Sequence, residues 1–340
     1  MQERLSRVIR RLALAAAVGA IALLASSPAA IGGPRRQQAA RAHAASTYTT
    51  GIGNEQVSMF ASSYWQRLHT KIVRYIVPYD AVHHLYWLDL AINFIRTAEQ
   101  SHQRVLVAFY HSENSPTRLP SVSAYKADVQ AFVKRFPYVR EYQSWDEANR
   151  GNEPHRFSSP NAVLDARYYQ ALLRVCHGCT VVGLDILDQD YVQPTLAYIA
   201  EFKREIYRLR TIMPTVWGLH DYSDVNRFES WRTPDIVRAF GGGQVWLTET
   251  GGIVKFGRGF PNVRGSGLRR AARVLRYTFD LAGSMARIKR LYLYDWTGGT
   301  PSTIFDAGLT NARGQPREGY LIVCKQLHVG GCNRVRITGT

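Results

Sequence analysis

The stretch KIVRYIVPYDAVHHLYWLDLAINFIRTAEQSHQRVLVAFYH, residues 71–111, decides the fold. Its two ends, 71–78 and 104–111, are strand-length runs of apolar and β-branched residues. Between them, residues 86–100 place apolar side chains at helical spacing. A strand, a helix and a second strand in this order form a unit whose two strands lie parallel. The stretch therefore predicts a parallel sheet covered by helices.

The same alternation recurs about eight times along the chain, which predicts a single (β/α)8 TIM barrel. The expected strands are residues 47–53, 71–78, 104–111, 139–145, 180–187, 215–222, 244–251 and 287–296. The expected helices are residues 86–100, 123–136, 166–176, 196–209, 234–240 and 267–285, and residues 319–327 close the ring. An open, doubly wound sheet is disfavoured because GIGNEQ, residues 51–56, lacks the third glycine of a dinucleotide-binding turn.

The amino terminus has the pattern of a secretory signal peptide. Arginines precede the apolar run LALAAAVGAIALLA, residues 12–25, and small residues follow it. This run is shorter than the roughly 18 residues expected of a spanning helix, which disfavours an uncleaved anchor. We expect a signal peptide over 1–30, cleaved after Ala29 or Ala44, a basic linker or late signal region over 31–46, and the barrel over 47–340.

The chain is strongly basic, with a formal net charge of +17. Removing residues 1–46 leaves 36 basic and 25 acidic side chains, a net charge of +11. Such a surface attracts anionic polymers or an acidic cell envelope, although scattered solvated charges on a secreted enzyme give the same total. The sequence has no RNA- or DNA-binding motif and no basic helix with interleaved aromatics, so we expect no nucleic-acid partner.

Four cysteines suit an exported protein with one or two disulfides. The simplest pairing joins Cys176 to Cys179 and Cys324 to Cys332. The Cys176-His177-Gly178-Cys179 sequence also suits a redox or zinc motif, but no second CxxC pair is present to complete a zinc site. With no HExxH motif either, we expect no metal and no cofactor.

Polar residues follow the apolar part of seven expected strands. In a TIM barrel the strands end at the rim that carries the active site. The residues at these ends are Asp80, His111, Asp146, Glu147, Asn149, Asp185, Asp188, His220, Asp221, Tyr222, Thr248, Glu249, Asp295 and Trp296. Carboxylates, histidines and aromatics that converge on one face indicate a site for a neutral, hydroxylated ligand.

Glu147 and Glu249 follow the fourth and seventh strands, which lie across the barrel mouth from each other. Two carboxylates are sufficient to cleave a glycosidic bond: one protonates the leaving oxygen, and the other attacks or positions water. The alternative to a catalytic role is a rim carboxylate that pairs with one of the many arginines. Glu153 competes with Glu147 for the first role.

The segments SWDEAN (144–149) and VWLTETGG (245–252) resemble the acid/base and nucleophile segments of clan A glycoside hydrolases. The resemblance implies the (β/α)8 fold and hydrolysis with retention, with Glu147 as acid/base and Glu249 as nucleophile. The layout over 47–327, with TVVGLDILD, RLYLYDWTG and FDAGL, is similar to a secreted actinobacterial branch of this clan. The motifs are specific to the clan but not to a substrate.

The resemblance also implies supporting roles. Tyr222 would donate a hydrogen bond to the nucleophile, His220 would orient a carboxylate, and Trp296 would form the aromatic floor of a sugar subsite. Asp80, His111 and Asn149 are candidate partners of sugar hydroxyls.

Two departures from the clan pattern Trp-Asn-Glu-Pro weaken the assignment. Asp146 replaces the asparagine, which removes an amide donor and, if ionised, raises the pKa of the neighbouring acid/base. Ala148 replaces the proline. Asn152-Glu153-Pro154 matches the string better but lies in the following loop, so its position favours Glu147.

The sequence thus predicts a secreted or envelope-associated retaining O-glycoside hydrolase that binds a carbohydrate substrate. After signal cleavage we expect no stable membrane insertion, and we expect a monomer. Because of Asp146, the alternative is a barrel that binds carbohydrate but has weakened catalysis. Binding of a glycan without release of reducing ends would distinguish the two.

Overall fold

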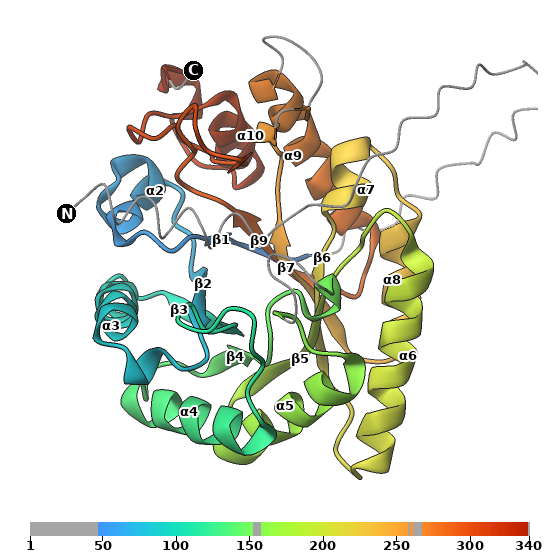
Figure 1. Ribbon diagram of the computed structural model, residues 1–340. Helices are drawn as coiled ribbons and strands as arrows, with labels where there is room; N and C mark the ends of the chain where they lie inside the picture. The colour runs from blue at the N-terminus through green and yellow to red at the C-terminus, as the bar shows by residue number, and fades with distance from the viewer. Residues whose placement is uncertain (1–46, 152–157, 258, 261–266, 339–340) are drawn as a thin grey trace, which may run out of the picture.

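The computed structural model describes residues 47–151, 158–257, 259–260 and 267–338. Eight parallel strands close into a barrel in the order β1-β2-β3-β4-β5-β6-β7-β9. Their bounds are β1 Thr49–Gly53, β2 Ile72–Pro78, β3 Arg104–Tyr110, β4 Glu141–Gln143, β5 Thr180–Leu187, β6 Val216–His220, β7 Gln244–Thr250 and β9 Ile288–Tyr294. The predicted (β/α)8 barrel is confirmed, and Figure 1 shows helices surrounding the strands.

Seven α-helices match the predicted ones in order and lie within a few residues of them, whereas the short helices α2 and α7 were not predicted. The α-helices are α2 Ser63–Arg67, α3 Leu85–Gln100, α4 Val122–Arg135, α5 Ala162–Val175, α6 Val192–Arg208, α7 Tyr222–Arg227, α8 Arg232–Phe240, α9 Gly267–Ser284 and α10 Glu318–Gln326. The short 3-10 helices are η1 Val57–Ala61, η2 Ala81–His83, η3 Ala148–Arg150 and η4 Cys332–Arg334. Side-chain caps define two starts: Ser121 accepts from the Ala124 amide of α4, and Asn161 accepts from the Leu164 amide of α5.

The sequence did not predict the small structure that follows β7 and β9. Strands β8 Lys255–Phe256 and β10 Phe305–Asp306 pair antiparallel outside the barrel. Phe305 packs with Tyr222 and Tyr294 in a separate apolar cluster. This two-stranded sheet is too short to give a sequence period, so its pairing depends on the barrel that brings the two loops together.

The core has two layers. One buried cluster lies inside the barrel and joins alternate strand residues, and a larger one fills the space between strands and helices. The inner cluster consists of Ile72, Leu106, Val182, Val216, Trp246 and Tyr292. Since strand side chains alternate between faces, the next inward position on β2 after Ile72 is Arg74.

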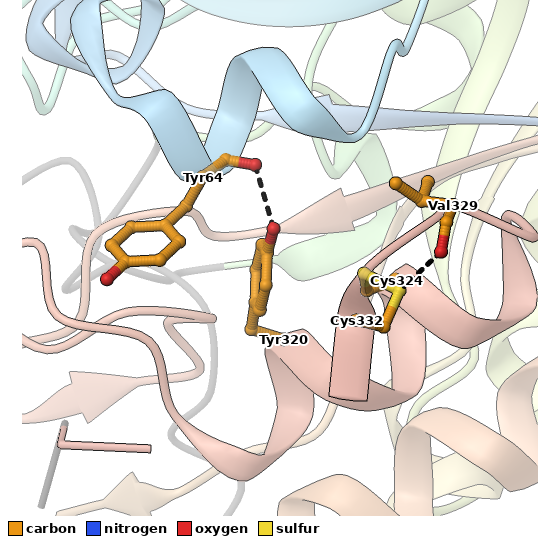
Figure 2. Close-up of a disulfide and its surroundings, with 5 residues drawn as sticks. All are labelled: Tyr64, Tyr320, Cys324, Val329 and Cys332. Carbon is orange, nitrogen blue, oxygen red and sulfur yellow. Dashed lines mark hydrogen bonds between the residues drawn. A yellow bond between two sulfur atoms is a disulfide. The ribbon is translucent and has the colours of Figure 1, made fainter. Parts of the chain in front are cut away.

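Two disulfides tie local segments, Cys176 to Cys179 and Cys324 to Cys332, as the simplest pairing predicted. Cys324 belongs to α10 and Cys332 to η4, so the second bond joins these two elements (Figure 2). Disulfides persist mainly in oxidising compartments, which hints at an extracellular protein.

The predicted signal peptide and linker lie outside the described residues. Within those that are described, no helix is both long and apolar enough to span a bilayer.

Candidate active site

Charged side chains from five strands meet at the carboxyl end of the barrel, where enzymes of this fold have their active sites. These residues are Arg74 of β2, Asp146 and Glu147 after β4, Asp185 of β5, His220 of β6 and Glu249 of β7. None of them is more than 5% exposed. Buried charges persist only when they are paired, so the contacts within this cluster define its chemistry.

Arg74 lies at the centre of the cluster. Its Nη1 donates to Glu249 Oε2 at 2.9 Å, its Nη2 donates to Asp146 Oδ1, and its Nε donates to Gln143 Oε1 at 3.3 Å. One planar guanidinium on β2 thus connects the ends of β4 and β7, two strands that are not neighbours in the barrel. The sequence analysis did not identify Arg74 as a site residue.

Glu147 adopts a left-handed backbone conformation, with φ 48° and ψ 51°, directly after β4. For a residue other than glycine, the left-handed conformation is less stable than the right-handed one by roughly 1–2 kcal/mol. The turn is held by the Glu147 amide, which donates to Asp185 Oδ2 at 3.2 Å. It directs the side chain inward, where Oε1 lies 3.0 Å from His220 Nδ1 and Oε2 accepts from Arg150 Nη1 at 2.7 Å.

His220 lies between two carboxylates. Nδ1 contacts Glu147 Oε1 at 3.0 Å, and Nε2 contacts Asp185 Oδ2 at 3.0 Å. Because both nitrogens face carboxylate oxygens, the ring satisfies both contacts only with a proton on each nitrogen. Burial opposes that charge, but Asp185, Glu249 and Glu147 outweigh it and raise the pKa of His220 well above its ordinary value.

Asp185 owes its position to a glycine on the neighbouring strand. A side chain at Gly218 of β6 would collide with Asp185 Oδ1 and crowd Thr248 Oγ1. Thr248 donates to that same Asp185 oxygen. Burial opposes ionisation of Asp185, yet His220, Arg74 and Thr248 together lower its pKa below the ordinary value. Asp185 is therefore the fixed negative charge beside His220.

Glu249 has two donors. Tyr222 donates its hydroxyl to Oε1 at 3.0 Å, and Arg74 donates to Oε2 at 2.9 Å. Burial raises the pKa of Glu249, and Glu147 adds to this effect, while His220, Arg74 and Tyr222 oppose it. The contact with Tyr222 is the one that the family resemblance implied.

The two predicted catalytic carboxylates belong to one network. Glu147 contacts His220, Glu249 contacts Arg74, and His220 Nε2 lies 3.5 Å from Arg74 Nη2. The ends of the fourth and seventh barrel strands therefore meet at a shared buried site.

Asp146 replaces an asparagine of the family pattern, and its charge is not isolated. Oδ1 accepts from Arg74 and, at 3.3 Å, from Gln143 Nε2. Burial raises the pKa of Asp146, and Glu147 and Glu249 add to this effect, against Arg74 and His220. A protonated Asp146 would regain one hydrogen-bond donor, as an asparagine has.

Two predicted supporting residues have other roles in the structure. Both polar atoms of the Asn149 amide bond the backbone of Leu187, at 2.9 and 2.8 Å, so the side chain ties η3 to β5 and is not left for a sugar hydroxyl. Trp296 is 2% exposed and packs edge-on against Tyr320 in the main core. A ring buried in this way offers no face to a sugar, so the expected subsite floor is corrected.

Asp80 and His111 contact residues outside this cluster. Asp80 Oδ2 pairs with His84 Nε2 at 3.1 Å, and in the described part of the chain no contact links Asp80 to Glu147 or Glu249. His111 is buried, with its ring against Tyr110 and Nδ1 3.1 Å from the Ser112 carbonyl oxygen. The competing Glu153 falls outside the described residues.

Asp146, His220 and Glu249 each place one possible ligand atom within 4.8 Å of the others, a spacing that suits a metal ion. Arg74 already donates to both carboxylates of this group. Its guanidinium thus supplies the positive charge that a metal would bring, and an added dication would have to displace it or accept strong repulsion.

A second acidic group lies next to this cluster. Tyr294, the last residue of β9, donates to Glu55 Oε2 at 3.2 Å, and Glu55 Oε1 is buried. Burial raises the pKa of Glu55 to about 8, and Glu249 adds to this effect. Sequence reasoning missed this pair because Glu55 follows a strand end in a segment without any motif.

Several buried acids make stability depend on pH. Burial raises the pKa values of Glu55 and Asp188 to about 8 and that of Asp221 to about 7. The folded state therefore binds protons that the unfolded state releases above about pH 4, so stability falls as pH rises through 5 to 8. We expect the thermal midpoint to be several degrees lower at pH 8.5 than at pH 5.

Differential scanning calorimetry across this pH range is the measurement. Asp221→Asn mimics the protonated acid and should flatten the decline. A midpoint that stays constant or rises from pH 5 to 8.5 in the unsubstituted chain would contradict the proton uptake.

Comparison with solved structures finds proteins that share this fold. GH10 from Paenibacillus barcinonensis matches with a TM-score of 0.60 and 11% identity, over 84% of this chain and 96% of that one. GH5_18 from Streptomyces cattleya in complex with GlcNAc matches with a TM-score of 0.60 and 14% identity, over 84% of this chain and 80% of that one. A family 39 glycoside hydrolase from Bacteroides cellulosilyticus WH2 matches with a TM-score of 0.52 and 14% identity, over 84% of this chain and 64% of that one.

These structural neighbours are glycoside hydrolases, and the chain shares their barrel. Identities of 11–14% show the fold alone. No family model matches the sequence, and no curated protein matches it either.

Proposed function

We propose that this chain is a retaining O-glycoside hydrolase, with Glu249 as nucleophile and Glu147 as acid/base. One observation carries the proposal: two glutamates that follow or end non-adjacent barrel strands meet at the carboxyl end, each held by a different set of donors. Different surroundings give two carboxylates different protonation behaviour, which a double displacement requires. Likeness to glycoside hydrolases supports this function at the level of the fold.

In the first step, an oxygen of Glu249 attacks the anomeric carbon. Glu147 transfers its proton to the leaving oxygen as the glycosidic bond breaks, which leaves the sugar esterified to Glu249. Tyr222 and Arg74 hold the attacking carboxylate in one orientation, since each donates to a different oxygen. This positioning reduces the entropy lost on reaching the transition state.

In the second step, Glu147 takes a proton from water. The water oxygen attacks the anomeric carbon, and the bond to Glu249 breaks, so both carboxyl groups return to their starting states. Both oxygens of Glu147 have a partner in the structure, His220 and Arg150. A leaving-group oxygen must therefore replace one of these contacts.

His220 positions Glu147 and brings a positive charge next to it, because its Nδ1 lies 3.0 Å from Glu147 Oε1. The charge on His220 therefore acts directly on the proposed acid/base. Asp185 favours the protonated form of His220 through its contact with Nε2. Asp185 is thus a positioning residue that acts through His220.

Asp185→Asn should move the alkaline limb of the kcat/KM profile to lower pH. Removing one adjacent negative charge weakens the protonated form of His220, and a shift of about one pH unit is expected. The acid limb, set by Glu249, should move less. The measurement is the pH dependence of aryl glycoside hydrolysis between pH 4 and 9.

Asp188→Asn is the matched control, because Asp188 lies just past the end of β5 and is also buried, but it accepts from the Ser223 and Asp224 amides. This variant should leave the alkaline limb in place. A uniform loss of kcat/KM at every pH in Asp185→Asn would indicate a purely structural role for Asp185.

A barrel that binds carbohydrate without hydrolysing it is the second candidate. The double engagement of Glu147 by His220 and Arg150 favours it, as does Asp146 in place of asparagine. Screening residues 47–340 against aryl glycosides and insoluble glucans separates the two functions. Release of aglycone or reducing ends supports the hydrolase, and binding without release supports the second candidate.

We also propose that the chain is exported, as in the secreted actinobacterial branch that it resembles. The basic and apolar pattern of residues 1–30 and the two disulfides support this location. The proposed partner is a carbohydrate substrate.

A further inference from the structure

A basic hollow lies far from the carboxyl end of the barrel. It has a volume of about 940 Å³ and is lined by Tyr64, Arg67, Gly330, Gly331, Asn333, Arg334, Val335 and Arg336. An adjoining hollow of about 660 Å³ shares Arg67 and Gly330. It also includes Thr49 and Lys71, at the starts of β1 and β2. The two hollows therefore form a groove on the amino-terminal side of the barrel, opposite the candidate active site.

The charged side chains that line this groove are all basic. Three arginines line the first hollow, and Lys71, His69 and His328 join Arg67 in the second. Among the described residues, no carboxylate forms an ion pair with Arg67, Arg334, Arg336 or Lys71, and neither hollow has a carboxylate in its lining. Guanidinium groups bind carboxylates, sulfates and phosphates through paired hydrogen bonds.

A hydrogen bond and a disulfide fix the walls of the groove. Tyr320 of α10 donates its hydroxyl to the Tyr64 carbonyl oxygen at 3.0 Å, which ties α10 to α2, the helix that carries Arg67 (Figure 2). The Cys324 to Cys332 disulfide joins α10 to η4, which carries Arg334. Both walls are thus anchored to α10.

An aromatic side chain adds a second kind of contact. Tyr64 is half-buried, packs edge-to-face on Tyr320 and lines the first hollow. A tyrosine ring beside guanidinium groups suits a sugar ring that carries an acidic group, because the apolar sugar face packs on the ring while the acid binds arginine.

From these observations we propose that the groove is a second, non-catalytic binding site for an acidic polysaccharide. The site would hold the protein on an anionic glycan while the opposite face acts on substrate. Long-range attraction by the net charge of +11 on residues 47–340 favours the encounter, and the arginines of the groove give it a fixed location. The inference does not depend on which glycoside is hydrolysed.

The test is the binding of polygalacturonate oligomers to residues 47–340, measured by isothermal titration calorimetry in 150 mM salt. Arg334→Ala with Arg336→Ala should weaken binding about tenfold or more, since each removes a charge-assisted hydrogen bond. Both side chains are exposed, so the thermal midpoint should not change. Activity on a small aryl glycoside should also be unchanged.

A matched variant removes the same charge elsewhere. Lys134→Ala with Arg135→Ala, at the exposed end of α4, should bind the oligomers as the unsubstituted chain does. The proposal is overturned if this control loses as much affinity, because generic charge then explains binding. It is equally overturned if polygalacturonate does not bind, or if an oligodeoxynucleotide of equal charge binds as tightly with the same dependence on Arg334 and Arg336.

Discussion

Glu249→Gln is expected to reduce glycoside hydrolysis by a factor of about 10⁴ or more, the scale on which losing a covalent nucleophile acts in other hydrolases. The amide cannot form the glycosyl ester, although it keeps the size of the side chain. Tyr222 and Arg74, which both donate to the carboxylate, would each lose part of their contact. Initial rates on the best aryl glycoside of the screen provide the measurement.

The control for Glu249→Gln is Glu141→Gln. Glu141 is also a buried glutamate on a barrel strand, and it pairs with Arg104 and Arg290 at the opposite end of the barrel. The Glu141→Gln variant should have a lower thermal midpoint but should retain turnover at temperatures below that midpoint. Hydrolysis by Glu249→Gln at the rate of the unsubstituted chain would exclude Glu249 as nucleophile.

Glu147→Ala is expected to have the second largest effect, and its size should depend on the leaving group. A general acid contributes about 10²–10⁴ to the rate, and a poor leaving group needs all of this assistance. Formation of the glycosyl-enzyme should fall by that factor for an alkyl glycoside and change little for a dinitrophenyl glycoside. Pre-steady-state rates on the two substrates provide the measurement.

Added azide distinguishes the two carboxylates. In Glu147→Ala, azide should restore turnover of an activated substrate and give a glycosyl azide of retained configuration, because it attacks the ester on Glu249. In Glu249→Ala it should give the inverted azide. An equal loss in Glu147→Ala for both leaving groups, without rescue, would reject the acid/base role.

The barrel could be predicted because its pattern is local and repeated. Stretches such as residues 71–111 contain a whole strand, helix and strand, and the polar residues at strand ends mark the rim that carries Glu147 and Glu249. Tyr222 was found in the same way, and its contact with Glu249 followed from the family resemblance.

Other parts of the site required the three-dimensional structure. Arg74 occurs in the middle of an apolar strand, and only the closed barrel shows which carboxylates pair with it. A charge on the inward face of a buried strand was nevertheless a usable signal, because such a charge needs partners. Asn149 and Trp296 follow strand ends, as expected of residues that contact a sugar. In the structure, however, the Asn149 amide bonds the backbone of Leu187, and Trp296 packs against Tyr320 in the core.

The most direct test of the double displacement is covalent labelling. A 2-deoxy-2-fluoro glycoside matched to the best substrate slows breakdown of the intermediate, so the sugar accumulates on the nucleophile. Peptide mass spectrometry should then find one glycosyl group on Glu249, and the first product of normal hydrolysis should keep its anomeric configuration. A label on another residue, or hydrolysis with inversion, would contradict the account.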